Sequence, residues 1–250
     1  MKRAAIFSLC LILAAPGALF ADEAATQDVQ RTPAQEAFLN LPEEDRIKFA
    51  EIINEAARLF QQKRIFESLE QIHEAKRIFD GSPETMNLEA SCYVEIRNFE
   101  RALEIYLTAE ELAPNNPSIK FNIAEVYFVT REWQKSHDRF TALFPSIPQE
   151  NIALSRLVEF KILLCKKRLG MDDEALILAN KYDFLDDSPF YYYAQAAIAF
   201  EADNQVKAEE WLAICARIFR NPQILAPWQD TLVEFGYIKS FYGEDLDDDR

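Results

Sequence analysis

Residues that could carry out chemistry are few in this sequence. The only histidines are His73 and His137, and they form no HExxH or similar pair. Of four cysteines, Cys92, Cys165 and Cys215 would remain if an N-terminal leader is removed. A zinc site needs several ligands at short, characteristic spacing, and three widely spaced cysteines build no disulfide framework. We therefore expect no metal ion and three buried free thiols, with one disulfide plus one free thiol as the alternative.

Motifs for covalent or cofactor catalysis are also missing. No GxSxG nucleophile elbow occurs, and five glycines in 250 residues leave little material for phosphate-binding or dinucleotide-binding loops. The acids between Asp183 and Asp187 lack the central Gly and terminal Glu of a calcium loop. Paired carboxylates that cleave glycosidic bonds are recognised only by their separation in space, and 42 acidic residues allow many pairs. We expect no enzyme and no cofactor; the alternative is a carboxylate-based enzyme, or enzyme subunit, that acts on glycans.

The charge balance restricts the class of partner. The chain has 27 basic and 42 acidic residues, which gives a formal net charge of −15. Binding of a nucleic-acid backbone needs a clustered basic surface that releases counterions, and an anionic membrane surface makes the same demand. We expect neither as a partner.

The N-terminus has the composition of a signal peptide. Lys2 and Arg3 precede an uncharged apolar run that is broken at Pro16 and ends at Ala21. The apolar part before Pro16 is shorter than the roughly 20 residues of a membrane-spanning helix, so an uncleaved anchor is the less favoured alternative. We expect residues 1–21 to be removed, no stable membrane insertion afterwards, and a periplasmic or extracellular protein.

Apolar spacing predicts an all-α chain. Residues 22–40 are expected to form a flexible leader with a short helix near residues 33–40. From residue 41 onward, apolar residues recur at three-to-four spacing in segments of 12 to 16 residues separated by short polar or Pro-containing breaks, a pattern typical of antiparallel helix pairs.

The sequence also repeats itself every 34 residues, in six columns at once. Small residues in some columns would permit close helix crossings, and large residues in others would fill the space between pairs. Pro83 and Pro117 open units, while Pro114 and Pro148 close them. The columns are Ala56, Ala90 and Ala124; Leu59, Tyr93 and Tyr127; Ile65, Phe99 and Trp133; Ser68, Ala102 and Ser136; Ile72, Tyr106 and Phe140; and Ala75, Ala109 and Leu143.

This pattern resembles the tetratricopeptide-repeat (TPR) family, whose 34-residue helix pairs carry small and aromatic residues at such positions and a closing Pro. The best match is the unit at 83–116; the next is 117–150, and the unit at 49–82 matches less well. After Pro148 the register slips, and we expect two degenerate units near 152–188 and 189–221. The resemblance thus predicts a TPR-like α-solenoid over residues 41–243, with a C-terminal capping helix at 222–243 and an acidic tail at 244–250.

The resemblance also implies where a partner would bind. In this family the first helix of each pair lines a concave groove that holds a peptide or a partner helix. Family members that grip a C-terminal carboxylate use basic residues there, which this chain lacks in its first three units. The alternative is that the aromatic residues at these positions are simply core. The candidate groove residues are Phe60, Asn87, Val94, Phe121, Glu125, Phe128, Tyr193 and Phe200.

The sequence therefore predicts an exported scaffold that mediates protein–protein interaction in the cell envelope. Aromatic residues flanked by acids would suit an apolar or amphipathic peptide of basic character. The identity of the partner is not encoded in any motif, and self-assembly into a homo-oligomer stays open.

Overall fold

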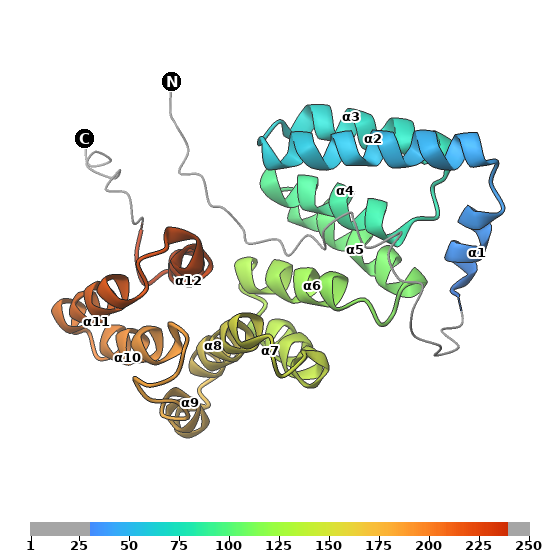
Figure 1. Ribbon diagram of the computed structural model, residues 1–250. Coiled ribbons are helices and arrows are strands. Elements are labelled where there is room, and N and C mark those ends of the chain that lie inside the picture. The colour runs from blue at the N-terminus through green and yellow to red at the C-terminus, as the bar shows by residue number, and fades with distance from the viewer. Residues whose placement is uncertain (1–30, 240–250) are drawn as a thin grey trace. The chain divides into compact units, whose positions relative to one another are not determined.

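The computed structural model describes residues 31–239, and in this part of the chain every regular element is helical (Figure 1). The prediction of an all-α chain is therefore confirmed. The predicted signal peptide, the leader before residue 31, the end of the capping segment and the acidic tail lie outside the described residues. The helices are α1 (Pro33–Leu39), α2 (Glu43–Gln61), α3 (Ile65–Ile78), α4 (Pro83–Glu95), α5 (Phe99–Leu112), α6 (Pro117–Val129), α7 (Trp133–Leu143), the 3₁₀ turn η2 (Phe144–Ser146), α8 (Ile152–Arg168), α9 (Asp172–Ala179), α10 (Phe190–Glu201), α11 (Gln205–Ile218) and α12 (Pro222–Phe235).

The chain divides into two compact parts, with the boundary inside α6 between Val126 and Tyr127. In the first part α2 packs against α3, α4 packs against α5, and α3 contacts α4. In the second part α8 contacts α7, α9, α10 and α12, while α10 pairs with α11. Consecutive helices thus pack side by side in both parts, as short connections require.

Helix starts are fixed by side chains that the local sequence supplies. Thr32 and Gln35 form a reciprocal capping box at α1. The Ser82 hydroxyl accepts a hydrogen bond from the Thr85 backbone N–H at 3.2 Å, ahead of Pro83 at the first position of α4. Asn side chains cap five more helices in the same way, at residues 98, 116, 151, 204 and 221.

Five turns between helices share one backbone geometry. One residue in each turn has a positive φ, and the N–H of the next residue bonds to a carbonyl five residues earlier, which is the Schellman arrangement. In the first turn Lys63 has φ 60° and the Arg64 N–H donates to the Leu59 carbonyl at 3.0 Å. The positive-φ residues are Lys63, Arg97, Arg131, Gly170 and Asp203. The first three are 34 residues apart, so the sequence repeat reappears as a repeat of backbone conformation.

First and second helices of the pairs are buried to different extents. The α4 and α6 helices are buried on almost every side, whereas α3, α5 and α7 keep one exposed face. Small residues allow close packing at the crossings: Ala56, Ala90, Ala102 and Ala124 are completely buried. The first helices α4 and α6 are therefore enclosed, whereas the first helix α2 keeps an exposed face. A polar residue on α4 or α6 needs a partner or a function.

Candidate functional site

The residues capable of metal or thiol chemistry do not converge in the described structure. No group of three His, Cys, Asp or Glu side chains that could hold a metal ion occurs within residues 31–239. His73 lies at the surface, 3.8 Å from Glu89, and His137 lies 3.1 Å from Asp138. The three described cysteines are free and buried. Burial raises the pKa of the Cys92 and Cys215 thiols to about 12, so both stay protonated and unreactive at neutral pH.

Five of the predicted groove residues belong to the first compact part, and all five are buried. Phe60 packs in an apolar cluster with Leu88 and Cys92. Val94, Phe121 and Glu125 are almost without exposed surface. Asn87 is also buried, but its side chain accepts a hydrogen bond from Asn122 Nδ2 at 3.0 Å.

Asn87 was predicted from the sequence as a groove residue, but its partner Asn122 was not. Asn122 on α6 is 2% exposed, and its Oδ1 has no hydrogen-bond partner among the described residues. A buried acceptor without a donor costs about 1–3 kcal/mol, so the arrangement needs an explanation. In the sequence, Asn122 stands out only as an Asn in the mostly apolar stretch from Phe121 to Phe128. The 34-residue repeat aligns Asn87 with Phe121, one residue before Asn122.

The other three predicted groove residues belong to the second part and join aromatic clusters. Phe128 packs edge-on against Trp133, with ring centroids 5.4 Å apart, and stacks on Phe235 at 6.1 Å. Tyr193 lies 5.9 Å from Phe160 and 5.4 Å from Trp228. Such contacts are what the core interpretation expects of aromatic side chains.

Phe200, the last of the eight residues, is only partly buried and stacks on Tyr237 with centroids 5.0 Å apart. The structure therefore brings the eight residues into several packed clusters, and a partner-binding role for them stays a prediction.

Charged residues on α8 are buried and paired. Glu159 accepts hydrogen bonds from Tyr182 Oη at 2.8 Å and from Lys181 Nζ, and lies 3.5 Å from Arg156. Burial alone would lower the pKa of Lys181, but the hydrogen bonds to Glu159 and Tyr182 raise it. Glu159 thus ties the segment after α9 to α8, because it accepts hydrogen bonds from Lys181 and Tyr182 of that segment. Arg156 pairs in addition with Asp186 at 3.0 Å.

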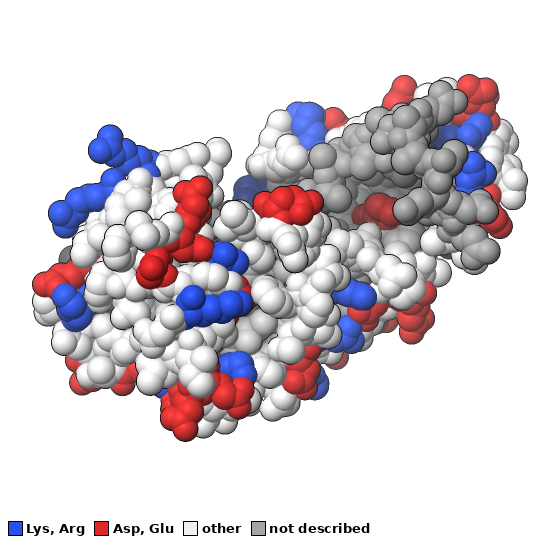
Figure 2. Space-filling view, turned by 60° about the horizontal axis from the view of Figure 1, so that its bottom comes forward, with Lys and Arg blue, Asp and Glu red and all other residues white. Residues whose placement is uncertain are grey.

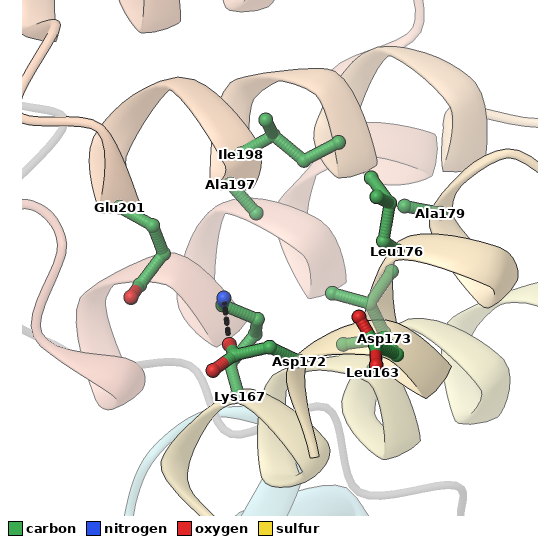
Figure 3. Close-up of a pocket in the computed structure, with 10 residues that line it drawn as sticks. Leu163, Lys167, Asp172, Asp173, Leu176, Ala179, Ala197, Ile198 and Glu201 are labelled. Atoms are coloured by element: carbon green, nitrogen blue, oxygen red, sulfur yellow. Dashed lines mark hydrogen bonds and ion pairs between the residues drawn. The ribbon is translucent and has the colours of Figure 1, made fainter. Parts of the chain in front are cut away.

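A cavity of about 220 Å³ lies between α8, α9 and α10 (Figure 3). Glu201 and the Lys167–Asp172 ion pair lie toward one end, and Leu176 and Ala179 lie toward the other. The hydroxyl of Tyr237 donates a hydrogen bond to Glu201 Oε1 at 2.6 Å. Burial and this hydrogen bond raise the pKa of Tyr237. The cavity combines an apolar lining with carboxylates. No sequence motif predicted it.

Charges on the visible surface are mixed. On the face shown in Figure 2, acidic and basic side chains form small separate groups with wide uncharged areas between them. Several of the ion pairs are between residues three apart on one helix, such as Arg101 with Glu104 at 2.6 Å, and contribute little to stability. Between residues 31 and 239, no helix is both long and apolar enough to cross a bilayer.

Comparison with known proteins identifies the fold. No protein-family model matches the sequence, and no curated protein matches it significantly. Solved structures do match. A MamA double mutant (RS-1 ArsTM) superposes with a TM-score of 0.55 at 16% identity, over 69% of this chain and 95% of its own. PilF of Pseudomonas aeruginosa superposes with a TM-score of 0.54 at 12% identity, over 78% of this chain and 94% of its own.

A third structure, YrrB, is described as a TPR protein with an unusual peptide-binding site. It superposes with a TM-score of 0.52 at 18% identity, over 75% of this chain and 95% of its own. Identities this low show the fold and nothing more. The similarity nevertheless extends over most of the chain, as the helix pairs and the repeated turns do. The predicted TPR-like α-solenoid is therefore confirmed as the fold of this protein.

Proposed function

We propose that this protein is a non-catalytic TPR scaffold of the cell envelope that binds a peptide or a partner helix through its first helices. Two observations support the class of function: the fold is shared with YrrB, a TPR protein with a peptide-binding site, and α4 and α6 carry buried polar side chains. Export rests on the N-terminal sequence, in which two basic residues precede a short apolar run that ends at Ala21.

The observation that carries the proposal is the Asn87–Asn122 pair. The two side chains bridge the first helices of consecutive units, and Asn122 Oδ1 is left as an acceptor. A peptide backbone offers one N–H donor per residue. Because Asn122 is buried, a bound peptide would satisfy this oxygen once the side chains that cover it move aside. An apolar core would instead favour Leu or Ile at position 122, because burying an unpaired amide oxygen is unfavourable.

Capture of the native partner tests the proposal. The tagged full chain is expressed in its own host, cross-linked and purified from the envelope. The captured partner is then identified, and peptides that cover its sequence are synthesised for binding measurements. Asn122→Ala is expected to weaken peptide binding about tenfold or more, with helicity retained. Asn115→Ala, at an exposed position between helices, serves as the matched control. Equal binding by wild type and Asn122→Ala would overturn this site, and failure of the wild type to capture any partner would count against the scaffold function.

Export has its own measurement. The intact mass of the protein recovered from its host is expected to correspond to a chain that begins within a few residues of Asp22. A mass that retains residues 1–21 would contradict cleavage.

A further inference from the structure

The cavity between α8, α9 and α10 arises from small side chains and a short helix. The α9 helix has 8 residues, whereas the second helices α3, α5 and α11 have 14 each. Ala175, Ala179 and Ala197 line the cavity and are almost completely buried. Because alanine extends little beyond the backbone, three of them at a helix junction leave space that larger residues would fill.

The size of the cavity suits a side chain. Its volume of about 220 Å³ lies below the ~300–1,000 Å³ of pockets that enclose a drug-sized ligand. Leu163, Leu176 and Ile198 contribute the larger apolar surfaces. An aliphatic side chain would therefore find apolar contacts on several sides.

The rim is acidic, and two of its carboxylates are uncompensated. Asp172 is paired with Lys167, but Asp173 and Glu201 form no ion pair with any described residue. Glu201 accepts a hydrogen bond from the Tyr237 hydroxyl, which is neutral. A cation placed beside an apolar cavity with two such carboxylates gains an attraction that surface exposure screens only in part.

The surroundings of the cavity favour a macromolecular ligand. Leu176 at the cavity is 52% exposed, and the same segment exposes Ile177, Phe184 and Leu185. A chain segment with four large exposed apolar residues offers more surface than a small molecule of cavity size would cover, and such clusters mark protein-interaction sites.

We propose that this cavity is a second binding site for the protein partner, and that it takes a basic amphipathic segment. An aliphatic side chain of that segment enters the cavity, and Lys or Arg residues on its two sides pair separately with Asp173 and with Glu201, which lie on opposite sides of the cavity (Figure 3). This inference rests on the proposed scaffold function and adds to it the chemistry of the segment that is recognised. The net charge of −15 would speed association with such a segment at low salt.

Defined peptides test the specificity. Three 12-residue peptides, acetylated and amidated, are compared by calorimetry and by methyl NMR: one with Leu and Lys at helical spacing, one with Ser in place of Leu, and one with Glu in place of Lys. Only the Leu–Lys peptide is expected to bind, with affinity that falls as salt rises, and to shift the methyl signals of Ala179, Ala197 and Ile198. Equal binding of the three peptides, no binding of any of them, or shifts confined to other helices would each overturn the inference.

Removal of the two rim charges tests the site. The double variant Asp173→Asn with Glu201→Gln keeps the shapes of both side chains and is expected to bind the Leu–Lys peptide at least about tenfold more weakly. Glu51→Gln with Glu70→Gln removes the same charge from exposed positions on α2 and α3 and should leave binding unchanged. If the native partner binds the rim variant as tightly as the wild type, the cavity assignment is wrong while the scaffold function stands. If the wild type has no partner, the scaffold function itself fails.

Discussion

The thiol of Cys92 donates a hydrogen bond to the hydroxyl of Ser68 across 3.5 Å, which joins α4 to the preceding helix α3. The same contact recurs between Cys165 and Ser136 at 3.6 Å. Ser68 and Ser136 lie in one 34-residue column, and the middle member of that column is Ala102. Two of three junctions therefore use a Ser, and the third uses an Ala that is completely buried.

The Cys92 thiol makes stability depend on pH above about 9. Burial raises its pKa from 9.0 to about 12, so between these values the unfolded chain releases a proton that the folded chain keeps. The free energy of unfolding should therefore fall as pH rises from 9 toward 12. Urea unfolding across this range is expected to show a shallower decline in Cys92→Val with Ser68→Ala, since that variant lacks the thiol. Identical slopes for variant and wild type would contradict the buried thiol.

The repeated turns predict opposite effects of two glycine substitutions. Arg131 is exposed and has φ 64°, and Gly170 has φ 73° with nothing within 4 Å of an added Cβ. A left-handed conformation costs a residue with a Cβ about 1–2 kcal/mol. We expect Arg131→Gly to raise the free energy of unfolding by up to about 1 kcal/mol, after the larger entropy of Gly in the unfolded chain is subtracted, and Gly170→Ala to lower it by about 1 kcal/mol. A lower urea midpoint for Arg131→Gly, or a higher one for Gly170→Ala, would show that the left-handed backbone conformation of these turns is not what limits stability.

The small residue at the α4–α5 crossing should not tolerate enlargement. Ala102 is completely buried, so Ala102→Trp must displace neighbouring helices and is expected to cost about 1–3 kcal/mol or more, as overpacking does. Ala213→Trp, at an exposed position of α11, is the control and should change the urea midpoint little. An unchanged midpoint for Ala102→Trp would place residue 102 away from a helix crossing.

Substitution of the two phenylalanines of α6 distinguishes a role in the core from a role in a partner-binding groove. Phe121 and Phe128 are 1% and 0% exposed, so conversion of each to Ser is expected to cost about 3–5 kcal/mol, as large-to-small changes in a core do. Phe66→Ser removes a Phe that is 70% exposed and should leave the melting temperature nearly unchanged. Circular dichroism melting is measured beside partner capture. A double variant that melts like the wild type but no longer captures the partner would support the groove role instead.

The buried carboxylate of α8 predicts a local as well as a global effect. Glu159→Ala removes the counter-ion of the half-exposed Lys181 and the acceptor of the Tyr182 hydroxyl, while Arg156 keeps Asp186 as a partner, and is expected to cost about 1–3 kcal/mol. Amide hydrogen exchange should also speed up in residues 180–189, because Glu159 anchors that segment. Glu150→Ala, at an exposed position, should do neither. Unchanged exchange in this segment would show that other contacts hold it.

The helix pairs could be predicted because packing at a crossing limits residue size. Ala56, Ala90 and Ala124 recur at 34-residue spacing and are all completely buried, so one structural cause produces the sequence pattern. Which face of a first helix is exposed to a partner could not be predicted in the same way. A helix with neighbours on both sides is buried nearly all round, and the spacing of its apolar residues does not say which face stays accessible.

The cavity lay beyond sequence analysis for a different reason. Leu163, Asp173 and Glu201 come from three helices, and their convergence depends on how soon α9 ends after Asp172. The local signal for that length is weak, since α9 ends at Asn180 and neither proline nor glycine follows directly. Asn122 was missed because the 34-residue register places Phe121, and not Asn122, opposite Asn87.

The shortness of α9 also bears on how the array unfolds. In a linear array each unit is held only by its neighbours, so cooperativity is set by the weakest interface in the series. A helix of 8 residues shares less apolar area with α8 and α10 than a helix of 14 could. In mild denaturant, opening should therefore begin at α9, while the direct contacts of α8 with α10 and α12 hold the flanking helices together.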